Sequence, residues 1–152
     1  MKRFSFKLEA LLNYREYLER LSKQKTAIVH IDINNCENLI NNLKGEHGKR
    51  VEAMDNLIQK EIESKTFKEH NDYLNMVDNR IEDENFKKKK LKKQLEQRLL
   101  DLKKKSVKKK IMELYKDKLK KRYKKEFLKN EQKELDEISN IKTIKALSNE
   151  TI

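Results

Sequence analysis

Residues 11–43 read LLNYREYLERLSKQKTAIVHIDINNCENLINNL, and the spacing of their apolar side chains decides the fold. The same apolar stripe continues to residue 62, in steps of three or four residues that average about 3.6, the period of an α-helix. The stripe has fifteen positions, and all of them except Lys25 and His47 are apolar. The positions are 11, 14, 18, 21, 25, 29, 33, 36, 40, 43, 47, 51, 54, 58 and 62. This spacing predicts one long helix. Because its period lies between the heptad and the eleven-residue repeat, the helix should be nearly straight and only weakly supercoiled.

The composition suits long helices and excludes most other folds. Charged residues make up 42% and apolar residues 36%, with no proline, no tryptophan and two glycines, so a thick core or a sheet with tight turns is excluded. The stripe keeps its phase across Gly45 and Gly48. This predicts that the helix continues through the two glycines, with a locally less stable point or a slight bend there. Cys36 is the only cysteine, so no internal disulfide can form and a reducing compartment is expected. We expect one all-α coiled-coil domain over 1–152.

A second helix begins at a capping signal. Thr66 can cap the free amides of a helix start, and Glu69, three residues later, can reach back to the cap amide. The predicted first helix therefore covers about 5–62, the turn about 62–66, and the second helix about 67–140. A short turn between two long helices makes them antiparallel neighbours, so the predicted fold is an antiparallel coiled-coil hairpin.

The predicted turn also sets which residues face each other. A turn centred near residues 64–65 places Tyr14 opposite about Tyr115, and Phe6 opposite about Tyr123. Residues beyond about 126 then have no partner and overhang. Because isolated helices are marginal in water, we expect this overhang to be helical when bound and frayed when free.

The first twenty residues carry more apolar side chains than a single seam requires. Leu11, Tyr14 and Leu18 follow the predicted stripe. The excess residues are Phe4, Phe6, Leu8 and Leu12. Two interpretations remain open: a hydrophobic cap that seals the end of the hairpin, or a docking end that enters another protein.

No catalytic or metal-binding pattern is visible. With two glycines the chain cannot build a glycine-rich phosphate loop, and His30, His47 and His70 lack the spacing of a helical metal site. Cys36 lies on the apolar stripe and is best explained as a small buried hydrophobe. No apolar run approaches the ~18 residues needed to cross a bilayer. We therefore expect a cytoplasmic protein that is no enzyme, has no cofactor or metal and does not insert into a membrane.

The net charge of +12 is concentrated in residues 87–125, which hold twenty Lys and Arg against four acidic residues. Three interpretations are open: a solvated helix face, a surface for an acidic protein, or a surface for nucleic acid. Nothing marks a base-stacking module, so we do not expect nucleic acid as a partner. A basic nucleic-acid-associated coiled coil and a generic structural coiled coil, such as a homodimer, remain the alternative functions.

The N-terminal motif resembles that of a known family. The residues are Phe6-Lys7-Leu8-Glu9, then Leu11-Leu12, then Tyr14-Arg15-Glu16. This pattern is similar to the start of the FliJ family, small cytoplasmic components of the flagellar type III protein export apparatus. The resemblance implies a two-helix antiparallel coiled coil like the central stalk subunit of rotary ATPases. It also implies a non-enzymatic accessory role in flagellar biogenesis, and thereby in motility and chemotaxis.

The resemblance further implies partners at both ends of the hairpin. The end with both termini would dock on the hexameric export ATPase, and the overhanging tail would deepen the insertion. The residues implied at this ATPase-facing end are Phe4, Phe6, Leu8, Leu11, Leu12 and Arg15. The other end would contact the export gate, a membrane protein, through Tyr73 and Val77. Emptied export chaperones would also bind, and the protein would lie peripherally at the cytoplasmic face of the flagellar basal body.

Overall fold

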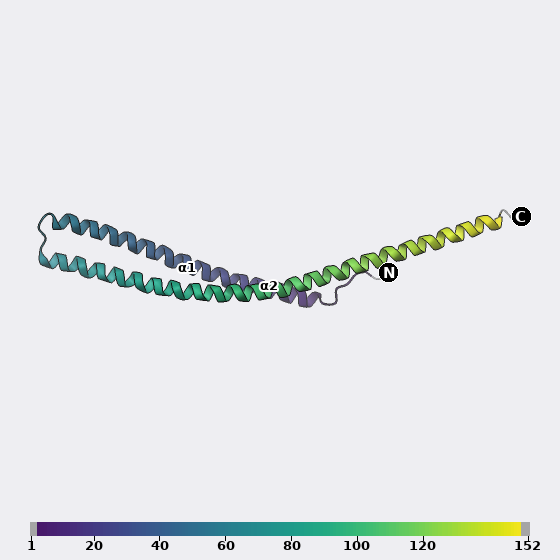
Figure 1. Cartoon of the computed structure of the whole chain (residues 1–152), viewed down its shortest axis with the longest axis horizontal. Coiled ribbons are helices and arrows are strands. Elements are labelled where there is room, and N and C mark those ends of the chain that lie inside the picture. The colour runs from purple at the N-terminus through teal and green to yellow at the C-terminus, as the bar shows by residue number, and fades with distance from the viewer. Residues whose placement is uncertain (1–2, 150–152) are drawn as a thin grey trace. The chain divides into compact units, whose positions relative to one another are not determined.

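Two long α-helices make up the structure, a computed structural model that describes residues 3–149, with side chains through residue 144. Helix α1 runs from Glu9 to Ile58 and helix α2 from Ser64 to Asn149 (Figure 1). The described residues contain no strand. The predicted all-α hairpin of two long helices is confirmed.

The loop between the helices covers 59–63, three residues before the predicted turn. Glu61 adopts a φ of 60°, in the left-handed region that few residues other than glycine occupy. The N–H of Phe67 donates to the carbonyl oxygen of Glu63 at 3.1 Å, so Glu63 holds the cap position predicted for Thr66. The chain therefore reverses earlier than the capping-box pattern indicated.

Both glycines lie inside α1, as predicted. An added Cβ would meet no atom within 4 Å at Gly45 or at Gly48, and neither glycine has a positive φ. The positions therefore carry the conformational cost of glycine without any local need for it.

Alanine at these positions is expected to stabilise the hairpin. Gly45→Ala and Gly48→Ala should each raise the free energy of unfolding by about 0.5–1 kcal/mol, because alanine restricts the unfolded chain and fits the helix. Urea unfolding followed by circular dichroism measures the change. The matched control is Ala53→Gly at an exposed position of the same helix, which should lower stability by a similar amount. Loss of stability in both alanine variants would contradict this account of the two glycines.

The chain divides into two compact units. The hairpin unit comprises residues 18–105, and the terminal unit comprises residues 3–17 with 106–149. In the hairpin unit the helices run antiparallel and side by side (Figure 1). Side-chain hydrogen bonds join them, from Ser22 to Asp101 and from Cys36 to Glu84. Its buried apolar core is formed by Val29, Ile33, Cys36, Ile40, Leu43, Leu74 and Val77.

The seam of the hairpin unit becomes polar toward the N-terminal part of α1. Glu19, Ser22 and Thr26 are buried there, whereas Leu18 and Leu21, which the stripe predicts on the seam, are only half-buried. The buried positions continue the alternation of three- and four-residue steps seen farther along the helix, the spacing of a coiled-coil seam. The predicted stripe was therefore wrong in this part, because it followed the apolar residues onto a neighbouring face.

Hydrogen bonds satisfy this polar part of the seam. The hydroxyl of Ser22 donates to the carboxylate of Asp101 at 3.2 Å, and that of Thr26 donates to the Ser22 carbonyl at 2.9 Å. Lys105 donates to Asp101 at 2.7 Å. The bond from Lys105, and to a lesser degree that from Ser22, holds the pKa of Asp101 below its usual value of 3.8. Buried polar groups are tolerated here because each finds a partner.

Candidate functional site

The interior of the terminal unit is a small cluster built from both helices and the segment before α1. Phe6, Leu12 and Met112 are 7%, 4% and 8% exposed. Phe4 and Leu119 are partly buried against them. The cluster contains Phe4, Phe6 and Leu12, three of the four residues that exceed the needs of a single seam.

Aromatic rings set the register of the terminal unit. The ring centroids of Phe4 and Tyr123 are 5.6 Å apart, and those of Phe6 and Tyr115 are 6.1 Å apart. The prediction that Phe6 faces Tyr123 and Tyr14 faces Tyr115 was therefore wrong. The loop comes earlier than predicted, and residues 3–6 are not helical. Phe4 and Phe6 are two positions apart in the sequence, yet the rings that they contact, on Tyr123 and Tyr115, are eight positions apart on α2.

The outer face of α1 in the terminal unit is apolar and exposed. Leu8, Leu11, Tyr14 and Tyr17 are 40%, 39%, 57% and 50% exposed. Leu11 and Tyr14, which the stripe predicts on the seam, lie outside it, and Leu12 occupies the seam instead. We call Leu11, Tyr14 and Tyr17, together with Leu8 of the turn just before the helix, the α1 outer face.

The six residues implied at the ATPase-facing end therefore divide between inside and outside. Phe4, Phe6 and Leu12 belong to the interior cluster, while Leu8 and Leu11 lie on the α1 outer face. Arg15 is half-buried, and its Nε is buried with no hydrogen-bond acceptor among the described residues. Tyr14 and Tyr17 were missed as surface residues. Both lie between the buried positions 12 and 19, which are one heptad apart, and this spacing is the signal that could have found them.

The two residues implied at the export gate also differ in exposure. Tyr73 is half-buried, with the Arg50 guanidinium carbon 4.7 Å from its ring centroid. Val77 is only 2% exposed and belongs to the core of the hairpin unit. Met76, beside it in the sequence, is 56% exposed. Met76 is therefore an exposed apolar side chain beside the two residues that the family resemblance implied, and the resemblance did not include it.

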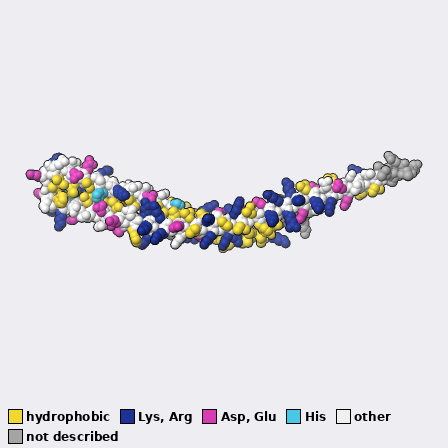
Figure 2. All heavy atoms as spheres, viewed as in Figure 1, with side chains coloured by type: hydrophobic (Ala, Val, Ile, Leu, Met, Phe, Trp, Pro, Cys, Tyr) yellow, Lys and Arg dark blue, Asp and Glu magenta, His cyan; other side chains and the backbone are white. Residues whose placement is uncertain are grey.

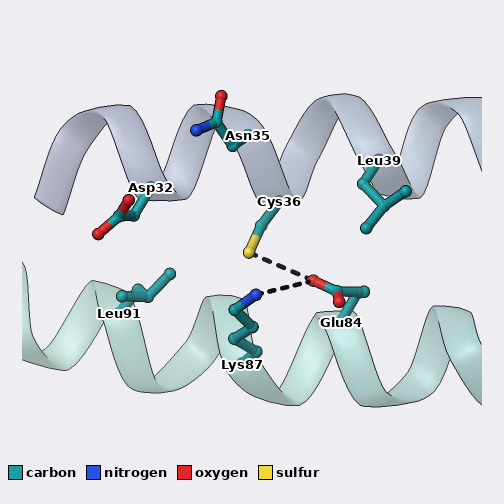
Figure 3. A pocket seen from close by; sticks show the side chains of 7 residues that line it. All are labelled: Asp32, Asn35, Cys36, Leu39, Glu84, Lys87 and Leu91. Carbon is teal, nitrogen blue, oxygen red and sulfur yellow. Dashed lines mark hydrogen bonds and ion pairs between the residues drawn. The ribbon is translucent and has the colours of Figure 1, made fainter.

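One pocket of the hairpin unit is lined by Cys36 and has a volume of about 330 Å³ (Figure 3). The Cys36 thiol, 3% exposed, donates to the Glu84 carboxylate at 3.4 Å, and the Lys87 ammonium lies 3.7 Å from the same carboxylate. Burial, and then the bond to Glu84, raise the pKa of Cys36, so the thiol stays protonated near neutral pH and is a poor nucleophile. The prediction of a buried small hydrophobe is confirmed.

Residues 3–149 lack two further classes of site. No helix there is long and apolar enough to cross a bilayer. The same residues contain no group of three or more His, Cys, Asp or Glu side chains placed to hold a metal ion.

Comparison with known proteins identifies the family. The model of the flagellar FliJ protein family matches residues 4–148. Among solved structures, the chain is similar to a putative YscO homolog, CT670, from Chlamydia trachomatis, at 18% sequence identity and a TM-score of 0.45, over 91% of this chain and 94% of that chain. No curated protein matches. Since the family model spans nearly all of the chain, the protein belongs to the flagellar FliJ protein family, non-catalytic components of the flagellar export apparatus.

Proposed function

We propose that the protein is a non-enzymatic accessory subunit of the flagellar export ATPase, and that its terminal unit docks on the ATPase ring. One observation carries the proposal: the terminal unit fills its interior and still leaves Leu11 and Tyr14 exposed on the α1 outer face. Burial of apolar surface contributes about 25 cal/mol per Å², so a partner that covers this face would gain substantial affinity. If the terminal unit served only to seal the hairpin, its interior cluster would be enough, and it would not need an exposed apolar face as well.

The overhanging part of α2 supports the same proposal. Side chains from residue 128 to residue 144 are all exposed, including Leu135, Ile138 and Ile141 at 66%, 51% and 54%. A single helix gains most of its stability in proteins from packing of an apolar face. Insertion of this overhang into the ATPase ring would supply such packing.

The loop end of the hairpin is the proposed contact with the export gate. Tyr73 and Met76 would form the contact surface, and Val77 would support them from the core. Export chaperones are the third proposed class of partner. The proposed location is the cytoplasm, at the face of the flagellar basal body.

Site-specific photocrosslinking tests the ATPase contact. A photoreactive amino acid at Tyr14 should crosslink to the cognate flagellar export ATPase, because this side chain lies on the α1 outer face. The matched control is the same group at Ile31, which is 57% exposed on α1 in the hairpin unit and should give no crosslink. A crosslink from Ile31 but not from Tyr14 would contradict docking through this face. The absence of a crosslink at both positions, in a sample that stimulates the ATPase, would also contradict it.

A further inference from the structure

A second apolar strip runs along α2 in the terminal unit. Val107, Ile111 and Leu114 are 50%, 60% and 57% exposed. Steps of four and three residues place the three on one face of the helix. Met112 and Leu119, which pack in the interior cluster, occupy the face toward α1. The strip therefore lies on the side of α2 that α1 leaves uncovered.

Cationic side chains border this strip. Residues 106–125 contain ten Lys and Arg but only two acidic residues, Glu113 and Asp117. Glu113 is engaged by Lys109 and Lys110, at 3.6 and 3.7 Å. The exposed lysines around the strip are Lys108, Lys110, Lys118, Lys121 and Lys125. Figure 2 shows dark blue Lys and Arg side chains interspersed with yellow apolar ones along α2.

The form of the strip favours one kind of partner. Apolar side chains at i, i+4 and i+7 present a seam about one helix wide, which is how helices dock on each other. A nucleic-acid surface would carry phosphate-binding groups at its centre rather than Ile111 and its neighbours. Helices that lie in a membrane interface bear a wider apolar face with Trp or Phe, and these three residues include no aromatic side chain.

We propose that Val107, Ile111 and Leu114, with the lysines around them, bind an acidic amphipathic helix of a partner protein. The apolar side chains would pack into the seam of that helix, and its carboxylates would pair with the flanking lysines. This docking face differs from the α1 outer face, so the proposal stands apart from ATPase docking through α1.

A synthetic heptad peptide tests the proposal on the full-length protein. The probe is a fluorescent peptide with Leu at positions a and d and Glu at e and g, and its comparison peptide has Lys at e and g. The acidic peptide should raise fluorescence anisotropy saturably and the basic one should not. Ile111→Glu should weaken binding at least about tenfold, whereas Ile31→Glu, the matched control at 57% exposure, should leave it unchanged.

A second variant keeps the test valid if Ile111→Glu disturbs folding. The double change Lys118→Glu and Lys121→Glu keeps the apolar strip and should also lose the acidic peptide. Equal affinity of wild type, Ile111→Glu and the lysine variant for the acidic peptide would overturn the proposal. The proposal would also be overturned if the wild-type protein bound a generic DNA duplex, or vesicles of equal parts phosphatidylcholine and phosphatidylglycerol, more tightly than the acidic peptide, and if Ile111→Glu removed that binding. Self-association removed by Ile111→Glu would instead assign the strip to a second copy of the chain, and would overturn it too.

Discussion

The double variant Leu11→Glu, Tyr14→Glu is expected to bind the flagellar export ATPase at least about tenfold more weakly than the wild-type protein. Exposed aromatic and aliphatic anchors dominate interface energies, and two carboxylates on the α1 outer face would have to be desolvated without partners. Helix content and thermal stability should change little, because both side chains lie outside the interior cluster. Biolayer interferometry with immobilised ATPase, together with circular dichroism, measures the two quantities.

The control for this prediction is a second pair of exposed apolar residues on the same helix. Ile28 and Ile31 are 58% and 57% exposed in the hairpin unit, and the variant Ile28→Glu, Ile31→Glu should bind the ATPase as the wild type does. If both double variants lost affinity equally, general charge repulsion would explain the effect. If neither lost affinity, the α1 outer face would not be the contact.

The variant Val77→Asp is expected to lose at least about 3 kcal/mol of unfolding free energy, because it places an unpaired charge at a core position that is 2% exposed. Met76→Asp changes a neighbouring side chain that is 56% exposed and should stay within about 0.5 kcal/mol of the wild type. Chemical denaturation followed by circular dichroism measures the unfolding free energy of both variants.

The same pair of variants tests the proposed gate contact. Met76→Asp should keep the fold and lose binding to the cytoplasmic domain of the export gate. Retained gate binding in a folded Met76→Asp protein would remove this residue from the proposed contact. Equal stability of the Val77→Asp and wild-type proteins would contradict the packing of the hairpin unit.

Periodicity predicted the fold because the middle of α1 is unambiguous. Val29, Ile33, Cys36, Ile40 and Leu43 follow the seam spacing and are all buried. Continuity of this stripe also predicted correctly that the helix passes through both glycines. A pattern that strong needs no tertiary information to identify a long helix with one buried face.

The N-terminal part of the same stripe misled the prediction for a physical reason. Ser22 and Thr26 occupy seam positions because local and cross-helix hydrogen bonds satisfy them. Tyr14 and Leu11, in contrast, lie outside although they are apolar. A count of apolar residues assumes that the apolar face is the buried one, and this assumption fails where an exposed apolar face coexists with a polar seam.

The predicted turn lies about one helical turn later in the chain than the observed loop. The same error shifted the predicted pairing of residues between the two helices. Thr66 and Glu69 form a plausible capping box by residue type, yet the cap lies at Glu63. Boundaries rest on local hydrogen bonds that several nearby residues could make, so they are less determined by sequence than the helix itself.

The N-terminal motif selected one segment as a candidate docking end, but it did not indicate how the side chains of that segment are oriented. It placed Leu8 and Leu12 at one docking end, although the first is 40% exposed and the second is 4% exposed. The strip around Ile111 was missed because its apolar residues lie within a run of lysines that dominates the local composition. The packing of Met112 and Leu119 in the interior cluster distinguishes the inner face of α2 from the outer one.

The most direct test of the central claim is ATP turnover by the cognate flagellar export ATPase, with and without this protein. The account predicts that the wild-type protein raises turnover or promotes ring formation, and that Leu11→Glu, Tyr14→Glu does so far less at equal concentration. No change in turnover or ring assembly on addition of correctly folded wild-type protein would contradict the claim that the terminal unit docks on the ATPase.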